Sequence, residues 1–397
     1  MLDEKRITGH APGLYLANAH VQWDRIAVED LPEMDFEPME RERYRLREGD
    51  LLVCEGGEVG RTAMWRGELA ECFYQKAIHR VRPRSDREIP RFFYYVMYSL
   101  ANRGVFVAGG NPNTIDHLTA VDLRHYRFAF PPLGEQRAIV AFLDGETAKI
   151  DALVSKKERL IELLMEKRGA LISRAVTRGL DPNAPMKDSS VEWLGEIPAH
   201  WKIEKNRWLF RETHGRSQHG DEELLTVSHI TGVTKRSEKN VTMIEPESHE
   251  GYRVCTTGEL VINTMWAWMG ALGIAREDGM VSPSYNVYQI SDRELNPVYY
   301  DYLSRSSAHV MELARMSKGV WKSRLRLYPA DFFDICTPVP PEREQSLIVA
   351  HLEHVVRQID GLLLAIERAI GQLLDLRSAL VSAAVTGRID VREGWAA

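Results

Sequence analysis

The side chains with the clearest chemical potential in this chain of 397 residues are two clusters of lysine and arginine, which could bind phosphate groups. Between Cys72 and Arg103 there are seven Lys or Arg and two acids, a local charge of +5 (seven minus two). Between Arg315 and Arg326 there are five basic residues and no acid. A single cluster is usually a solvated face. One cluster in each half of the chain favours two surfaces that follow the phosphates of a nucleic acid.

The candidate DNA contacts are seven cations and one tryptophan in or near these clusters: Arg61, Lys76, Arg80, Arg82, Lys318, Trp321, Lys322 and Arg324. Arg61 ends a glycine-rich loop, and the stretch from 76 to 82 alternates as a strand would, with its cations on one face. Trp266, Trp268 and Trp321 are interpreted as core or loop-packing residues, with stacking or minor-groove contact as the alternative.

No motif for catalysis, metal binding or nucleotide binding occurs in the sequence. Four cysteines lie far apart, at 54, 72, 255 and 336, which favours buried free thiols in a reducing cytosol. No apolar run of about 18 residues predicts a membrane span. The net charge of −6 argues mildly against nucleic-acid binding, but it says little when basic residues are clustered.

A repeat in the sequence indicates the elements that position the two basic clusters. Pro131-Pro132-Leu133-Gly134-Glu135-Gln136 returns as Pro340-Pro341-Glu342-Arg343-Glu344-Gln345, an offset of 209 residues that holds to Val176 and Val385. Each copy predicts one long helix, since a double proline suits a helix start and an early glutamate faces the positive end of the helix dipole. Thr386-Gly387 is a plausible end of the second helix.

A seven-residue apolar ladder runs along both predicted helices and indicates that they pack on each other and on partner subunits. Its members are Leu143, Ile150, Leu164 and Leu171 in the first helix, with Lys157 as a polar break, and Leu352, Ile359, Ile366, Leu373 and Leu380 in the second. Companion seam positions include Leu153, Leu160, Val355, Leu362 and Leu376. The simpler alternative is that each is a long core helix of its own domain.

The remaining chain forms two variable segments with the same outline. Leu51–Cys54 is predicted as a buried strand that matches 260–263, 91–100 as a helix, and Tyr126–Phe130 as a strand that leads into the prolines. The predicted division is 1–132 for the first domain, 133–180 for the first long helix, 181–190 for a linker, 191–339 for the second domain and 340–397 for the second long helix and tail. Because Met1 aligns with Phe210, the first domain is expected to lack about twenty opening residues that the second domain has.

These motifs resemble the specificity subunits of type I restriction-modification systems. The resemblance rests on the two Pro-Pro-x-x-Glu-Gln helix starts, on Gly49-Asp50-Leu51-Leu52-Val53, and on Val191-Glu192-Trp193-Leu194-Gly195-Glu196-Ile197-Pro198. It covers nearly the whole chain, apart from the short start of the first domain.

The resemblance implies an α+β fold, in which two globular α/β target-recognition domains are separated by two long helices that pair as an antiparallel coiled coil. Each domain would read one half of a split site in double-stranded DNA, and the helices would set the spacing of the halves. The chain would have no catalytic residue, metal or cofactor. It would dock two methyltransferase subunits and two restriction subunits, which would carry S-adenosylmethionine, ATP and Mg, in the cytoplasm and without a membrane.

Two other classes of function are weighed against this one. A stand-alone methyltransferase or nuclease needs a cofactor fold and a catalytic tetrapeptide, and the sequence has neither. A coiled-coil scaffold with an impaired or inactive first recognition domain is the alternative that remains open.

Overall fold

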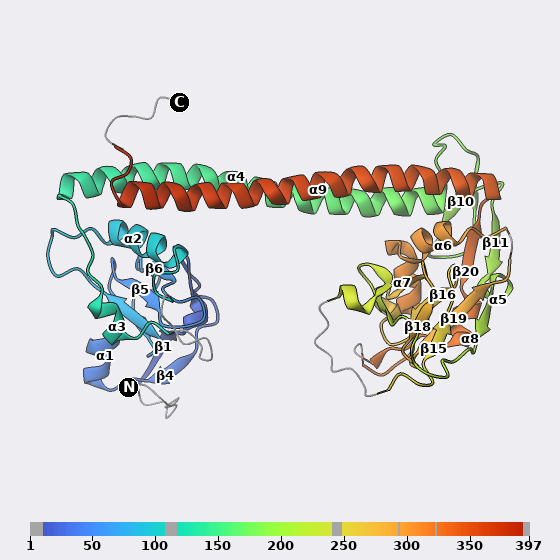
Figure 1. Ribbon diagram of the computed structural model, residues 1–397, viewed down its shortest axis with the longest axis horizontal. Coiled ribbons are helices and arrows are strands. Elements are labelled where there is room, and N and C mark those ends of the chain that lie inside the picture. The colour runs from blue at the N-terminus through green and yellow to red at the C-terminus, as the bar shows by residue number, and fades with distance from the viewer. Residues whose placement is uncertain (1–10, 108–116, 240–247, 293, 322–323, 392–397) are drawn as a thin grey trace. The chain divides into compact units, whose positions relative to one another are not determined.

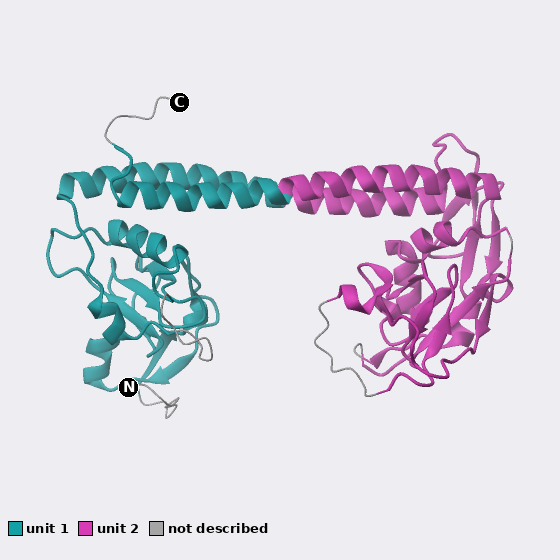
Figure 2. Ribbon diagram, in the orientation of Figure 1, with its two compact units in different colours: residues 1–158, 367–397 teal, residues 159–366 magenta. Residues whose placement is uncertain are grey.

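The computed structural model describes residues 11–107, 117–239, 248–292, 294–321 and 324–391. The chain divides into two compact units (Figure 2), unit 1 with residues 1–158 and 367–397 and unit 2 with residues 159–366. The boundary falls inside two long helices, α4 (Leu133–Arg178) and α9 (Glu342–Val385), so each unit contains one end of each helix (Figure 1). Two mixed α/β bodies and two long helices make up the predicted α+β fold class.

Both long helices begin at the predicted double prolines. The backbone N–H of Gln136 donates to the carbonyl of Pro132 and that of Gln345 to Pro341, each at 3.0 Å. Helix α9 ends before Gly387, whose φ of +69° is the left-handed conformation that favours glycine after a helix. The predicted linker 181–190 contains a strand, β9 (Met186–Asp188), which pairs with β10 (Glu196–Pro198).

Helices α4 and α9 run antiparallel within each unit, as two ion pairs demonstrate. In unit 1, Arg377 Nε lies 3.0 Å from an Asp151 carboxylate oxygen. In unit 2, Arg168 Nε lies 3.2 Å from Asp360. The seven-residue ladder lines this contact: Leu143, Ile150, Leu352, Ile359 and Ile366 are buried, and Leu164, Leu171, Leu373 and Leu380 are half-buried.

Of the companion positions, Val355 is half-buried, whereas the four leucines are not covered by described residues of the chain. Leu153 is 48% exposed and Leu376 is 55% exposed in unit 1, and Leu160 is 44% and Leu362 is 53% exposed in unit 2. Two helices bury one stripe between them, so a second apolar stripe on each helix stays on the outside unless other helices cover it.

The globular part of unit 1 is built on two three-stranded sheets with the orders β4-β1-β7 and β6-β5-β8. Its elements are β1 (Pro12–Leu16), β2 (Val21–Gln22), β3 (Arg25–Ile26), β4 (Glu33–Asp35), α1 (Pro38–Tyr44), β5 (Leu51–Cys54), β6 (Thr62–Met64), β7 (Phe73–Tyr74), β8 (Ile78–Val81), α2 (Pro90–Asn102) and α3 (Ala120–His125), with a 3-10 turn at Asn18–His20. The aromatic side chains of α2 form a core with Ile139 and Leu143 of α4 and with Val381 and Ala384 of α9.

Unit 2 contains a four-stranded sheet with the order β12-β19-β16-β17. Its further elements are β11 (Lys202–Lys205), α5 (Asn206–Leu209), β12 (Phe210–Thr213), β13 (Leu225–Ser228), β14 (Gly232–Lys235), β15 (Arg253–Cys255), β16 (Leu260–Asn263), β17 (Leu272–Ile274), β18 (Gly279–Val281), β19 (Tyr285–Ile290), α6 (Pro297–Ser304), α7 (Ser307–Met316), α8 (Pro329–Asp334) and β20 (Cys336–Val339), with 3-10 turns at Arg236–Glu238 and Ala267–Met269. Its core includes Ala175 and Val176 of α4 and Ile348 and Leu352 of α9.

The two units repeat one plan. Strand β5 lies between β6 and β8 as β16 lies between β17 and β19, and Leu51 pairs with Val81 as Leu260 pairs with Tyr288. Helices α2 and α6 contact β6 and β17 respectively.

The prediction of a strand at 126–130 is wrong. Its counterpart β20 is a strand because β11 pairs with it, whereas no described residue pairs with 126–130.

Candidate nucleic-acid interface

The cations of the first cluster are tied to the body of unit 1 more closely than a charge count suggests. Arg82 donates from Nε and Nη2 to the carboxylate of Asp50, at 2.5 and 2.6 Å, and Asp50 is fully buried. The hydrogen bonds to Asp50 raise the pKa of Arg82 above its ordinary value. Arg80 donates to the carbonyls of Arg43 and Arg45, at 2.9 and 3.0 Å, and lies over the ring of Tyr74.

Arg61 and Lys76 differ in how far they are exposed. Arg61 donates from Nη2 to the carbonyl of Asn18 at 3.1 Å, lies 3.5 Å from Glu58, and keeps only 14% of its side chain exposed. Lys76 is exposed, just before β8. Of the four candidates in unit 1, Lys76 is the one whose burial class is exposed.

A cleft of about 1230 Å³ opens beside β8. Its wall includes Lys76, Arg80, Arg82, Arg84 and Arg124, and its apolar side includes Phe93, Phe128 and Phe130. The cleft therefore lies beside an edge strand and is lined by basic side chains on one side and by aromatic side chains on another.

The second cluster forms a loop between α7 and α8 of unit 2. Lys318 and Arg326 bridge across its base by a backbone pair, and Lys318 Nζ donates to Asp331 at 2.5 Å. Trp321 at its tip is 68% exposed, and Arg324 is exposed beside it. Lys322 lies outside the described residues.

Trp321 and Trp266 correct the preferred interpretation of the tryptophans as packing residues. Trp321 stands at the tip of the loop and Trp266 is 49% exposed. Leu327, at the end of the loop, donates its N–H to the carbonyl of Thr264, which places the strand-to-turn segment around Trp266 beside the loop. Trp268 is half-buried and donates from Nε1 to the carbonyl of Met265, as a packing residue does. Two exposed indoles next to exposed cations provide the stacking and phosphate contacts that nucleic acids accept.

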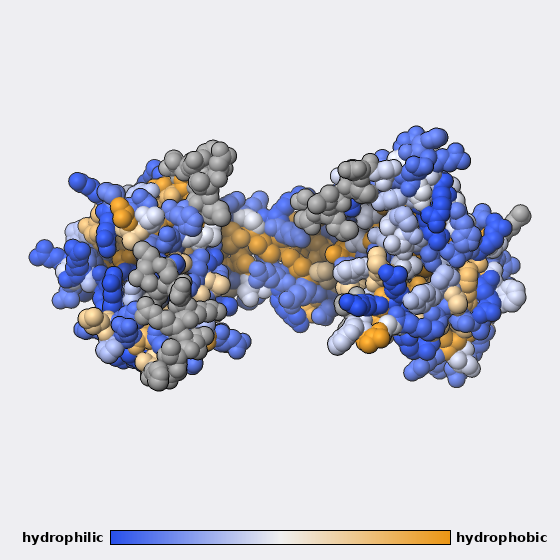
Figure 3. Space-filling model, turned by 90° about the horizontal axis from the view of Figure 1, so that it is seen from below, coloured by the Kyte–Doolittle hydropathy of each residue, from blue (hydrophilic) through white to orange (hydrophobic). Residues whose placement is uncertain are grey.

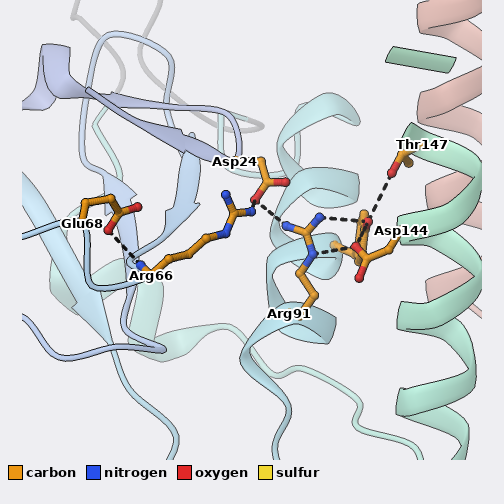
Figure 4. A network of polar contacts seen from close by, with 7 residues as sticks. Asp24, Arg66, Glu68, Arg91, Asp144 and Thr147 are labelled. Atoms are coloured by element: carbon orange, nitrogen blue, oxygen red, sulfur yellow. Dashed lines mark hydrogen bonds and ion pairs between the residues drawn. The ribbon is translucent and has the colours of Figure 1, made fainter. Parts of the chain in front are cut away.

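A network of polar contacts, which no sequence motif predicts, joins the globular part of unit 1 to α4 (Figure 4). Arg91 forms ion pairs with Asp24 and with Asp144 of α4, the latter at 2.7 Å. Tyr95 also donates to Asp144, at 2.6 Å. Arg66 adds a 2.9 Å hydrogen bond to Asp24. Burial alone would lower the pKa of Arg91, but the hydrogen bond and charge of Asp24 outweigh it and raise the pKa, so this guanidinium is a structural cation.

The last residue of each Pro-Pro-x-x-Glu-Gln motif is a glutamine that forms three hydrogen bonds to backbone groups, and we call each of these arrangements a glutamine clamp. The buried amide of Gln136 accepts from the N–H of Ile89 at 3.0 Å and donates to the carbonyls of Arg87 and Pro131. The buried amide of Gln345 accepts from the N–H of Asn296 at 2.8 Å and donates to the carbonyls of Glu294 and Pro340. Ile89 and Asn296 precede α2 and α6, so one device ties each long helix to the corresponding body helix.

Exposed apolar side chains gather along the long helices (Figure 3). They are Leu153, Leu374 and Leu376 in unit 1 and Leu160, Leu163, Met165, Leu362 and Leu364 in unit 2, each 44% to 61% exposed. We call this set the helix stripe. A patch of this kind on a protein surface marks a site of association.

The described residues provide little for chemistry. No group of three or more His, Cys, Asp or Glu among them could hold a metal ion. Burial raises the pKa of Cys72 and Cys255 to about 12, which keeps these thiols protonated and unreactive. None of the helices in the described part of the chain is both long and apolar enough to span a bilayer.

Comparison with known proteins agrees with the fold and the motifs. Residues 35–163 match the family model of the type I restriction modification DNA specificity domain. The chain is 24% identical over 368 residues to the specificity subunit of the Escherichia coli type I restriction enzyme EcoBI, covering 88% of this chain and 75% of that protein. A solved structure described as showing complex assembly and conformational transition of the type I R-M system covers 96% of this chain and 92% of its own, with a TM-score of 0.69 and 15% identity. The HsdS subunit from Thermoanaerobacter tengcongensis covers 96% and 91%, with a TM-score of 0.51 and 16% identity.

The match to a DNA specificity domain thus lies in unit 1 and the start of α4. In sequence and fold the chain is similar to the specificity subunits of type I restriction-modification systems, as its repeated motifs predict.

Proposed function

We propose that each unit reads one half of a split site in double-stranded DNA and that the two long helices set the spacing of the halves. The observation that carries this proposal is the pair of glutamine clamps. Gln136 and Gln345 hold two bodies of different sequence on equivalent helix starts by the same three hydrogen bonds. An asymmetric bipartite target requires two different recognition bodies that are attached at equivalent positions of the two helices.

In unit 2 the loop from 317 to 326 would make the leading contacts, because Trp321 and Arg324 are exposed at its tip. In unit 1, Lys76 would take this part. Arg61, Arg80, Arg82 and Lys318 already contact protein atoms, so we propose that they shape the DNA-facing surface and contribute through their charge.

The helix stripe supports a scaffolding role. We propose that it docks two modification subunits, one on each of two equivalent surfaces, and that two restriction subunits join through the same complex. Since the chain provides no cofactor motif, S-adenosylmethionine, ATP and Mg would be held by these partners, in the cytoplasm. Leucine side chains that are about half exposed in the free chain would each contribute about 1 to 2 kcal/mol when covered.

Replacement of two stripe residues tests the docking. In Leu160→Glu/Leu362→Glu, co-purification with the modification subunit should fall at least 10-fold, because two carboxylates would have to be buried in an apolar contact. The control variant Gln358→Glu adds one carboxylate at an exposed position of the same helix and should bind as the parent chain does. Undiminished binding by the double variant would place docking elsewhere.

Sequencing of the methylated sites in cells that carry this system tests the recognition. We expect two defined half-sites with a fixed spacer, and a Trp321→Ala/Arg324→Ala chain should relax only one of them. If the double variant methylates the same sites as the parent chain, the proposed role of the loop is refuted.

The open cleft in unit 1 favours one alternative, a scaffold whose first recognition domain is impaired. In that case the methylated sites would share only the half-site that unit 2 reads.

A further inference from the structure

Trp266 lies in the turn that connects strands β16 and β17 of unit 2, and 49% of its surface is exposed. Its backbone N–H donates to the carbonyl of Asn263 at 3.0 Å, and its own carbonyl accepts from the N–H groups of Met269 and Ala271. The main chain of Trp266 is therefore fixed by hydrogen bonds inside the turn, whereas its side chain remains open to solvent.

Further contacts hold this turn against the rest of unit 2. The hydroxyl of Thr264 donates to the carbonyl of Ser284 at 2.9 Å, and the carbonyl of Thr264 accepts from the N–H of Leu327 at 3.0 Å. Gly270 ends the turn with a φ of +86°, and a Cβ atom there would lie 2.9 Å from Cγ2 of Val310 in α7. The turn is thus packed closely on α7 and is held at both of its ends.

The turn between β5 and β6 of unit 1 is held in the same way. The carbonyl of Glu55 accepts from the N–H of Leu118 at 2.7 Å, and both residues lie 209 positions before their counterparts in unit 2. Gly60 ends this turn with a φ of +81°, and a Cβ atom there would lie 2.5 Å from the ring of Phe106. The two units therefore share individual contacts that fix this turn.

The side chain at the exposed position is what differs between the two turns. The residue 209 positions before Trp266 is Gly57, which has a φ of +76°. Because equivalent contacts form around a glycine in unit 1, the turn does not need the indole in order to fold. The hydrogen bond between Thr264 and Leu327 also places the turn beside the loop that carries exposed Arg324. An exposed indole next to a cation suits contact with nucleic-acid bases.

We propose that Trp266 inserts its indole into the base stack of the half-site that unit 2 reads, and so contributes to the specificity for that half-site. This inference rests on the proposed function, in which unit 2 binds one half of a split DNA site. A side chain that enters a base step opens it, and so favours the steps that unstack at the lowest cost. Because the turn is already fixed in the free protein, insertion requires little further ordering of the chain. Unit 1, with Gly57 in this place, lacks the contact.

The test uses the full chain in complex with its modification subunit. Once the methylated sites have been sequenced, duplexes are made with the fluorescent adenine analogue aminopurine at single positions of both half-sites. Its emission rises when its neighbours no longer stack on it. The parent complex should raise the emission severalfold at one step, in one half-site only. The methylated position is left out, because methyltransferases turn their target base out of the helix.

Substitution of Trp266 should remove this signal. Trp266→Ala should abolish the rise in emission and weaken the affinity for the target by about 10-fold, because it removes the stacking of an aromatic ring on the bases. Trp266→Phe keeps an aromatic ring and should retain most of both effects. The control variant Trp208→Ala removes another exposed indole of unit 2, on α5, and should behave as the parent does.

The outcomes separate this inference from the proposed function. If the parent complex binds both half-sites specifically and Trp266→Ala has the same affinity and emission, the inference is wrong and the proposed function stands. The same holds if no unmethylated position shows a rise in emission with the parent complex. Loss of the fold in Trp266→Ala also overturns the inference, since the indole is then a packing residue. If the parent complex does not distinguish the half-sites from random DNA, the proposed function fails as well.

Discussion

Arg377 of α9 donates from Nε to Asp151 of α4 across 3.0 Å, and its guanidinium lies over the ring of Tyr98. Within unit 2 the equivalent pair is Arg168 with Asp360, because Asp151 and Asp360 are 209 residues apart and so are Arg168 and Arg377. The repeat therefore places the same ion pair once in each unit, with the acid and the base exchanged between the two helices.

The two pairs differ in burial, and their removal should differ in cost. The side chain of Arg377 is 10% exposed, whereas that of Arg168 is 39% exposed. Arg377→Ala should lower the free energy of unfolding by about 1 to 2 kcal/mol, since it removes a packed guanidinium with its contact over the Tyr98 ring. Arg168→Ala should cost under about 1 kcal/mol. Urea unfolding of both variants checks this, and equal costs would contradict it.

The glutamine clamps should be sensitive to truncation. Gln136→Ala or Gln345→Ala leaves one backbone N–H and two carbonyls without their partner, so each should cost about 2 to 4 kcal/mol of unfolding free energy. Gln372→Ala, at an exposed position of α9, should change it by less than about 0.5 kcal/mol. Thermal unfolding measures the difference. A clamp variant as stable as Gln372→Ala would show that the hydrogen bonds contribute little.

Substitution of Arg324 should affect mainly DNA binding, whereas substitution of Arg82 should affect mainly stability. Arg324 is exposed, so Arg324→Ala should weaken DNA binding and reduce the slope of log affinity against log salt by about 0.9, with stability unchanged. Arg82→Ala instead leaves the buried carboxylate of Asp50 without its ion pair, and should lower the free energy of unfolding by about 2 kcal/mol or more. Fluorescence titration of a DNA duplex at several salt concentrations, with urea unfolding beside it, measures both. A large salt effect with no loss of stability for Arg82→Ala would make that residue a direct phosphate contact.

Stability should fall in mild acid because of one histidine. Burial lowers the pKa of His309 from 6.5 to about 4, where its ring is stacked edge-on against Trp193. The unfolded chain therefore binds this proton more readily, so the contribution of His309 is fully present above pH 6.5 and is lost as the pH falls towards 4. The loss amounts to about 3 kcal/mol. Urea unfolding from pH 7 to 4.5 should show a flatter pH dependence for His309→Leu, and an unchanged slope would exclude His309 as the cause.

Shortening both helices should change the spacer and not the half-sites. Residues 153–159 of α4 lie opposite 369–375 of α9, by the register of the two ion pairs, so both segments must be removed together. Seven residues of helix correspond to about 10 Å, or about three base pairs. Sequencing of methylated sites should find the original half-sites with a shorter spacer. New half-site sequences would refute the idea of a ruler.

Much of the framework could be predicted, because it is encoded locally. The double prolines, the seven-residue ladder and the constant offset predicted both long helices, and Leu51–Cys54 is a buried strand as expected. The role of Gln136 could not be predicted, because its partners at 87 and 89 become neighbours only on folding.

The candidate site was predicted less well. A count of charges along the sequence does not include ion-pair partners that are distant in sequence. Asp50 lies 32 residues before Arg82 and neutralises it. The packing role expected of Trp321 failed because a loop between α7 and α8 carries it into solvent. The companion leucines follow a core period, yet they are exposed among the described residues.

The ion pair that recurs in both units has a consequence for assembly. Helix α9 alone carries an acid at 360 and a base at 377, the two complementary halves of one contact. An antiparallel pair of two α9 helices would therefore place Asp360 of one copy opposite Arg377 of the other, the positions that Asp151 and Arg168 of α4 supply here. Such a homodimer would present two identical recognition bodies, and under the proposed function it would read a palindromic site.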